Sequence, residues 1–114
     1  MAKTLDFNAL KMPKLPLVMS DDEKTCIVVT APPEGLVEEL QSAGPEFKKV
    51  LESKDVEGVQ ACYELAARLI SYNQSGLQVT AEDLRYKYKI PWYGLIFFFN
   101  AYADFISEIQ NAKN

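Results

Sequence analysis

The first third of the chain carries the pattern of short β-strands. Leu15 to Met19 is an apolar run, and Pro16 within it cannot donate a hydrogen bond, which is typical of an edge strand. The β-branched run from Lys24 to Thr30 predicts the most secure strand, and the Ser and Asp residues of 20–23 predict the turn between the two. The sequence therefore predicts an antiparallel hairpin, to which the alternating segment Thr4–Asn8 could add a third short strand.

The second strand of this hairpin is apolar on both faces. Ile27 and Val29 point to one side, whereas Cys26 and Val28 point to the other. A hairpin packed against helices on one side only would leave its second face exposed. A helix on that side, self-association or a bound partner would each cover it.

The period of the apolar positions changes from two to 3.6 residues at Pro32-Pro33, where a helical body should begin. Gly44-Pro45 is a strong stop signal and predicts a helix boundary at that point. Further along, Asp55 suits an N-cap, and Thr80-x-x-Asp83 approximates a capping box. The expected helices are Glu34–Ala43, Pro45 to about Ser53, Asp55 to about Asn73, one from Thr80 and one from Pro91 to about Ala112.

Together these patterns predict an α+β fold in a single domain of 114 residues. Residues 1–31 form the hairpin region, and residues 32–114 form a body of four or five helices. A chain of this length can bury a core without disulfides.

The last helix combines a core-facing stripe with an anomaly on its polar face. Eight apolar side chains fall within an arc of about 140°: Trp92, Leu95, Phe98, Phe99, Tyr102, Phe105, Ile106 and Ile109. The opposite face carries Asn100, Asp104 and Glu108 together with two aromatic residues, Tyr93 and Phe97. Either another element of the domain covers that aromatic pair or a partner does.

The composition argues against catalysis. The chain has no histidine, which removes the Ser/His and Cys/His couples and histidine-containing zinc sites. It contains no GxSxG, P-loop or GxGxxG motif. The acidic turn Asp21-Asp22-Glu23 lacks the spacing of a calcium loop. We therefore expect no enzyme, no metal site and no cofactor.

The charge distribution argues against nucleic-acid binding. The net charge is −4, and the segment 20–67 alone holds 11 acidic and four basic residues, so its field repels phosphate. Arg85 to Lys89 alternates basic with aromatic residues, which could stack on bases. Cations are equally typical of a helix C-terminus, however, because they interact favourably with its dipole.

The cysteines and the apolar runs bear on where in the cell the protein lies. Cys26 and Cys62 lie in apolar stripes without a CxxC spacing, so we expect two free thiols that are mostly buried. Residues 1–19 contain no continuous apolar stretch of the kind found in signal peptides. The run from Ile90 to Phe99 is interrupted by Pro91 and Gly94 and is too short to cross a membrane. These features predict a cytoplasmic protein without a membrane partner.

The layout resembles the tail assembly chaperones of phages and prophages of Gram-positive bacteria with long, siphophage-type tails. The residues that carry the resemblance are Leu5-Asp6-Phe7, Leu36 to Leu40, Phe98-Phe99-Asn100-Ala101-Tyr102 and Phe105-Ile106. The resemblance implies a protein that binds the long, helical tape measure protein and keeps it soluble during tail assembly, in the host cytoplasm. It also implies self-association for some members.

The sequence leaves two classes of function open. The first is such a chaperone, a non-enzymatic binding protein whose partner-binding residues would be Trp92, Tyr93 and Phe97. The second is a small homo-oligomeric structural or adaptor protein without client-holding activity. Exposed aromatic residues suit the first, because they provide a large contact area at a small entropic cost.

Overall fold

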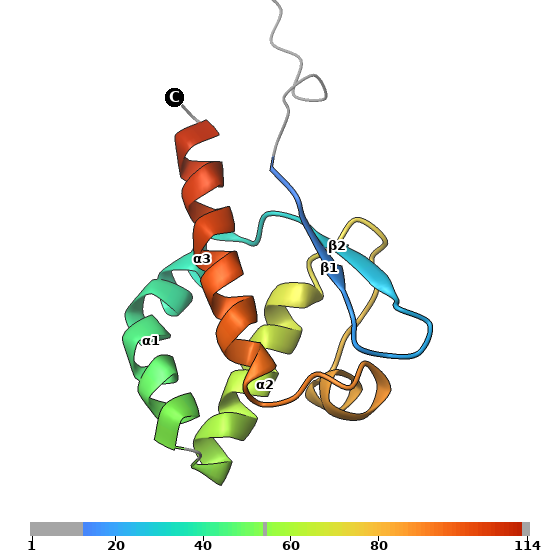
Figure 1. The fold of residues 1–114 in the computed structure, drawn as a ribbon. Helices are drawn as coiled ribbons and strands as arrows, with labels where there is room; N and C mark the ends of the chain where they lie inside the picture. The colour runs from blue at the N-terminus through green and yellow to red at the C-terminus, as the bar shows by residue number, and fades with distance from the viewer. Residues whose placement is uncertain (1–12, 54, 113–114) are drawn as a thin grey trace, which may run out of the picture.

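An N-terminal β-hairpin is followed by helices, so the α+β prediction is confirmed (Figure 1). The computed structural model describes residues 13–53 and 55–112. The predicted third strand, Thr4–Asn8, lies outside the described residues. Two strands and four helical elements form the described part: β1 (Leu15–Val18), β2 (Cys26–Val29), α1 (Glu34–Ser53), α2 (Val56–Ile70), η2 (Asp83–Lys87) and α3 (Gly94–Ala112).

The hairpin has the predicted strands and turn. β1 and β2 pair antiparallel, with Val18 opposite Cys26. The turn is closed by Asp21, whose carboxylate accepts hydrogen bonds from the backbone N–H of Thr25 at 2.9 Å and from its hydroxyl at 2.5 Å. The hydroxyl bond in particular lowers the pKa of Asp21.

The prediction that both cysteines are buried is wrong for Cys26. Ile27 and Val29 face the core, so the strand's alternation places Cys26 on the outer face, where it is exposed. Val18 across from it is also exposed. The prediction is confirmed for Cys62, which is fully buried in α2, and both thiols are free.

The predicted helix boundary at Gly44-Pro45 is also wrong. α1 continues through these residues to Ser53. A proline inside a helix removes one backbone hydrogen bond, but packing offsets that loss, because residues on both sides of it, including Leu36, Leu40 and Val50, still contact one core. The five expected helices therefore become four helical elements in the described part of the chain.

α2 lies at the centre of the core. Asp55 is its N-cap, as predicted, although the helix ends at Ile70, before the expected Asn73. Gly58 allows α1 to approach closely, since a Cβ at this position would clash with the side chain of Val50. The buried residues of α2 are Val59, Cys62, Tyr63, Leu65, Ala66, Ala67, Leu69 and Ile70.

The loop after α2 fastens the helical body to the hairpin. Asn73 is buried, and its side-chain amide donates to the carbonyls of Ile70 and Leu77, both at 2.8 Å. Its side-chain oxygen accepts from the backbone N–H groups of Ser75 and Leu77. Asn73 also forms a β-bridge with Val29, so one side chain organises the loop that borders β2.

The segment before the last helix confirms the predicted capping box. The backbone N–H of Thr80 donates to the Asp83 carboxylate, and the backbone N–H of Asp83 donates to the Thr80 hydroxyl, both at 3.1 Å. The turn that follows, η2, is π-helical, because the N–H of Tyr88 reaches back to the carbonyl of Asp83. α3 then begins at Gly94, after a turn over residues 91–93, three residues later than expected.

The predicted core stripe of α3 is largely confirmed. Its buried members are Leu95, Phe98, Tyr102, Phe105, Ile106 and Ile109. Phe99 and Trp92 are only partly buried and pack against the edge of the core. The opposite face is exposed at Asn100, Asp104 and Glu108, as the helical phase requires.

Candidate functional site

A groove lined by apolar residues separates the hairpin from the last helix. β1 forms one wall, the first two turns of α3 form the other, and side chains from α2, η2 and residue 90 close the floor. The groove has a volume of about 240 Å³. Its lining residues are Leu17, Val18, Met19, Ile70, Leu84, Ile90, Gly94, Leu95, Phe97, Phe98 and Ala101.

Two large side chains stand exposed at the rim of this groove. Phe97 of α3 is 71% exposed, and Val18 of β1 is 67% exposed. Phe97 lies there because its neighbour Phe98 takes the core-facing position, which turns Phe97 about 100° toward solvent. Exposed apolar side chains around an apolar groove are typical of a protein-binding surface.

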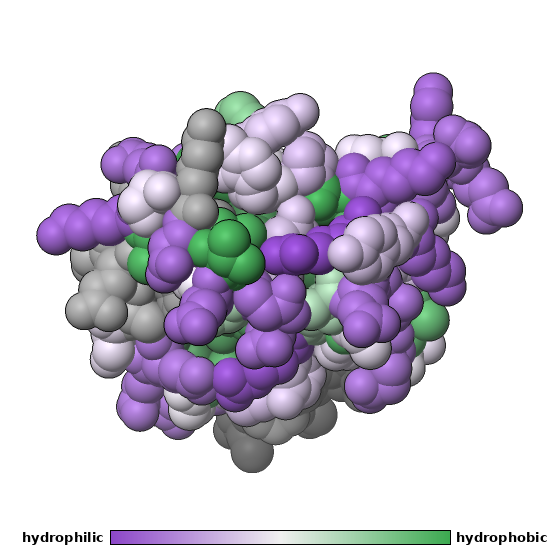
Figure 2. Space-filling view, turned by 90° about the horizontal axis from the view of Figure 1, so that it is seen from below, coloured by the Kyte–Doolittle hydropathy of each residue, from purple (hydrophilic) through white to green (hydrophobic). Residues whose placement is uncertain are grey.

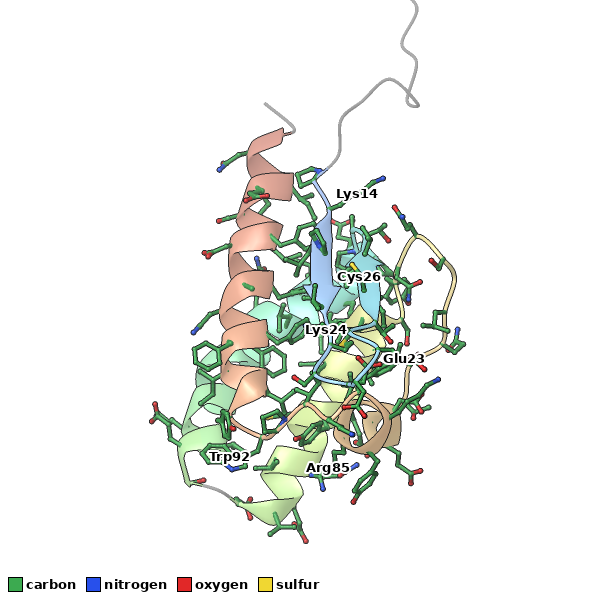
Figure 3. The ribbon with its side chains drawn as sticks, turned by 45° about the vertical axis from the view of Figure 1, so that its right-hand side comes forward. Lys14, Glu23, Lys24, Cys26, Arg85 and Trp92 are labelled. Carbon is green, nitrogen blue, oxygen red and sulfur yellow. The ribbon has the colours of Figure 1, made fainter. Side chains whose placement is uncertain are left out.

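The three residues predicted to bind a partner lie on two surfaces. Phe97 lines the groove, whereas Tyr93, in the turn before α3, is 54% exposed and does not line it. Trp92 contacts Tyr93 edge to face, with ring centroids 5.6 Å apart. Trp92 does not line the groove; it belongs to a second hollow near the end of the molecule that Figure 3 shows at the bottom.

This second hollow is mixed in character. It has a volume of about 380 Å³ and is lined by Val56, Val59, Tyr63, Arg85, Tyr86, Ile90, Pro91 and Trp92. The Arg85 guanidinium lies 4.3 Å from the centre of the Tyr63 ring, a cation–π contact. The face drawn in Figure 2 likewise shows small apolar patches separated by hydrophilic side chains.

Tyr63 in the second hollow has a structural role, because its contacts join α2 to neighbouring segments of the chain. Its hydroxyl donates to the carbonyl of Ile90 at 2.7 Å, which ties α2 to the segment before α3. Burial, as the main cause, raises the pKa of Tyr63 above its ordinary value. The hydroxyl therefore stays protonated near neutral pH and keeps its role as a donor.

The alternating segment Arg85 to Lys89 does not form a single row of exposed side chains. Tyr86 is exposed, but Tyr88 is buried in the core. Arg85 stacks on Tyr63, and the Lys87 ammonium lies 5.4 Å from the Tyr88 ring. The aromatic and basic side chains of this segment thus make contacts within the fold instead of a continuous stacking platform.

Within residues 13–53 and 55–112, no group of three or more His, Cys, Asp or Glu side chains could hold a metal ion. In the same part of the chain, no helix has the length and apolar character needed to cross a bilayer.

No protein family, curated protein or solved structure matches the chain. The resemblance to tail assembly chaperones therefore stays a prediction.

The sequence indicated one wall of the groove and missed the other. The helical phase of α3 marked Phe97 as an apolar residue on a polar face. The signal on β1 was Pro16, which predicts an edge strand but does not say what lies beside the edge. Only the tertiary structure places Val18 across a groove from Phe97.

Proposed function

We propose that this protein is a non-enzymatic binding protein that holds an apolar segment of a client protein, in the manner of a tail assembly chaperone. The observation that carries the proposal is the apolar groove between β1 and α3, with Phe97 and Val18 exposed at its rim. Two large apolar side chains beside an apolar groove suit a surface that a partner covers. The client suggested by the family resemblance is a tape measure protein, and the compartment is the host cytoplasm.

The second candidate is a small homo-oligomeric structural or adaptor protein. The outer face of the hairpin supports it, because Val18 and Cys26 lie opposite each other and both are exposed. A second copy of the chain could cover this face. The two candidates differ in what binds: a foreign client in the first, and only the chain itself in the second.

Co-expression with a tape measure protein encoded in the same gene neighbourhood tests the proposal. Soluble client is measured with the wild type, with the double variant Tyr93→Ser/Phe97→Ser and without the protein. The double variant should remain folded, since both side chains are exposed, and should lose client binding, because central aromatic residues commonly contribute about 2 kcal/mol each.

A matched control removes two exposed tyrosines away from the groove. Tyr72 is 41% exposed and Tyr86 is 72% exposed, and neither lines the groove. The variant Tyr72→Ser/Tyr86→Ser should retain client solubilisation. Failure of the wild type to solubilise the client would refute the chaperone proposal, and undiminished rescue by the folded Tyr93/Phe97 variant would refute the site.

A further inference from the structure

The two arginines of the chain differ in their counter-ions. The side chain of Arg68 is 55% exposed, and its guanidinium donates two hydrogen bonds to the Glu39 carboxylate, at 2.8 and 3.0 Å. Arg85 is partly buried, yet the ion pairs in the described part of the chain join only Arg68 to Glu39 and Lys89 to Asp22. A carboxylate is the usual partner of a guanidinium that packing removes from water. The less exposed arginine is therefore the one that lacks a carboxylate.

The packing of Arg85 uses the flat face of its guanidinium. That face lies over the Tyr63 ring, 4.3 Å from its centre. The N–H groups of a guanidinium lie in its plane, so stacking leaves them free to donate to an acceptor at the edge. The Nε atom is buried and donates to no residue that the structure describes. Because a buried N–H without an acceptor is unfavourable, Arg85 suits an acceptor that these residues do not supply.

Arg85 lines the second hollow, whose other lining residues are mostly apolar. None of its described lining residues is acidic, and Arg85 carries the one charge among them. At the rim, Val56 is 78% exposed and Tyr86 is 72% exposed. The volume of about 380 Å³ lies in the range of small-molecule sites, which combine apolar walls with a few polar groups. One cation within apolar walls is complementary to a small ligand with one negative charge and an apolar body.

We infer that the second hollow binds a small carboxylic acid as its anion, with the carboxylate on Arg85 and the apolar body against Tyr86, Val56 and Trp92. Arg85 and Trp92 lie at the same end of the molecule (Figure 3). A guanidinium holds a carboxylate through two parallel hydrogen bonds, as Arg68 holds Glu39 in this chain. A phosphate, with its higher charge, is less well matched by a single cation.

This inference goes beyond the proposed function and does not depend on it. The second hollow and the groove between β1 and α3 share one described lining residue, Ile90. Loss of client binding would therefore leave the carboxylate site standing, and failure of the carboxylate site would leave the proposed function standing.

The test uses phenylacetate and its uncharged amide, phenylacetamide, which has nearly the same shape. Trp92 is the one tryptophan of the chain and lines the hollow, so its fluorescence reports binding to the full-length protein. Phenylacetate should give a saturable change with a Kd of about 1 mM, as expected for a ligand of this size. Phenylacetamide should bind at least about tenfold more weakly, because it cannot form charge-assisted hydrogen bonds.

The variant Arg85→Gln should bind the acid no better than the amide. The matched control Arg68→Gln removes the other guanidinium, which does not line this hollow, and should keep the wild-type preference for the acid. NMR of the arginine Nε–H groups keeps the test valid if Arg85→Gln does not fold. The signal that remains in Arg68→Gln belongs to Arg85, and phenylacetate should shift this signal more than phenylacetamide does.

Three results would each overturn the inference. The first is equal binding of phenylacetate and phenylacetamide, or no saturable change in either signal up to about 10 mM. The second is an unchanged preference for the acid in folded Arg85→Gln. The third is tighter binding of the blocked peptide acetyl-Phe-Glu-Phe-amide than of phenylacetate, which would assign the hollow to an acidic side chain of a partner protein.

Discussion

Phe97 and Phe98 are adjacent, chemically identical residues in very different surroundings, and truncating each in turn tests the assignment of the α3 faces. Phe98 is only 9% exposed, and its ring packs against Phe99 and Tyr102 with centroids 5.3 and 5.5 Å away. Phe97 is 71% exposed. The variants are Phe97→Ala and Phe98→Ala.

The expected difference follows from the buried area. Truncating a buried phenylalanine costs about 3–5 kcal/mol, because it removes apolar contacts and leaves a cavity, so Phe98→Ala should lose that much stability. Phe97 buries about 30% of roughly 200 Å², or about 60 Å². At about 25 cal/mol per Å² this corresponds to about 1.5 kcal/mol, which is an upper value for Phe97→Ala.

Urea unfolding followed by circular dichroism measures both free energies of unfolding. The slope with denaturant should be the same in the wild type and in Phe97→Ala, so that the shift in midpoint reports stability alone. Equal costs for the two variants, or a larger cost for Phe97→Ala, would refute the assignment. Phe97 would then be covered in solution, and the groove would not have the exposed rim on which the proposed function depends.

Three further predictions concern the hairpin and the helical core. Cys26 should react within seconds with a thiol reagent at pH 8, because it is exposed. Cys62 should react only on unfolding, because it is buried and burial raises the pKa of its thiol to about 11. Rapid labelling of both thiols would contradict the burial of Cys62 in the core. Gly58→Ala should destabilise the protein by about 1–3 kcal/mol in thermal or urea unfolding, because the added methyl meets Val50; unchanged stability would mean that α1 and α2 are further apart. Asn73→Ala should cost about 2–3 kcal/mol in the same assay, because it leaves buried backbone groups unpaired, and a loss below about 0.5 kcal/mol would contradict its hydrogen bonds.

Local signals were sufficient for the elements that depend on neighbouring residues. The hairpin follows from an apolar run and a β-branched run on either side of an Asp-rich turn. The side chains of Thr80 and Asp83 reach only three residues along the chain. Gly44-Pro45 failed as a stop signal because packing on both sides of it holds α1 together. A local preference of about 3 kcal/mol can be offset by a core that the sequence does not display.

The candidate site was predictable only in part, for a related reason. The helical phase is a local property, and it identified Tyr93 and Phe97 as apolar residues on a polar face. The separation of Phe97 from Trp92, which lines a different hollow, depends on where the chain turns before α3. The second wall of the groove depends on β1 and α3, which are distant in sequence and meet only in the folded chain.

The most direct test of the central claim is a hydrogen–deuterium exchange footprint of the client on this protein. The complex with the tape measure protein is compared with the free chain, peptide by peptide. Protection on binding should concentrate in residues 17–19 of the hairpin and 94–101 at the start of α3, which line the groove. Protection confined to α1, or an unchanged exchange pattern in these two segments, would contradict it.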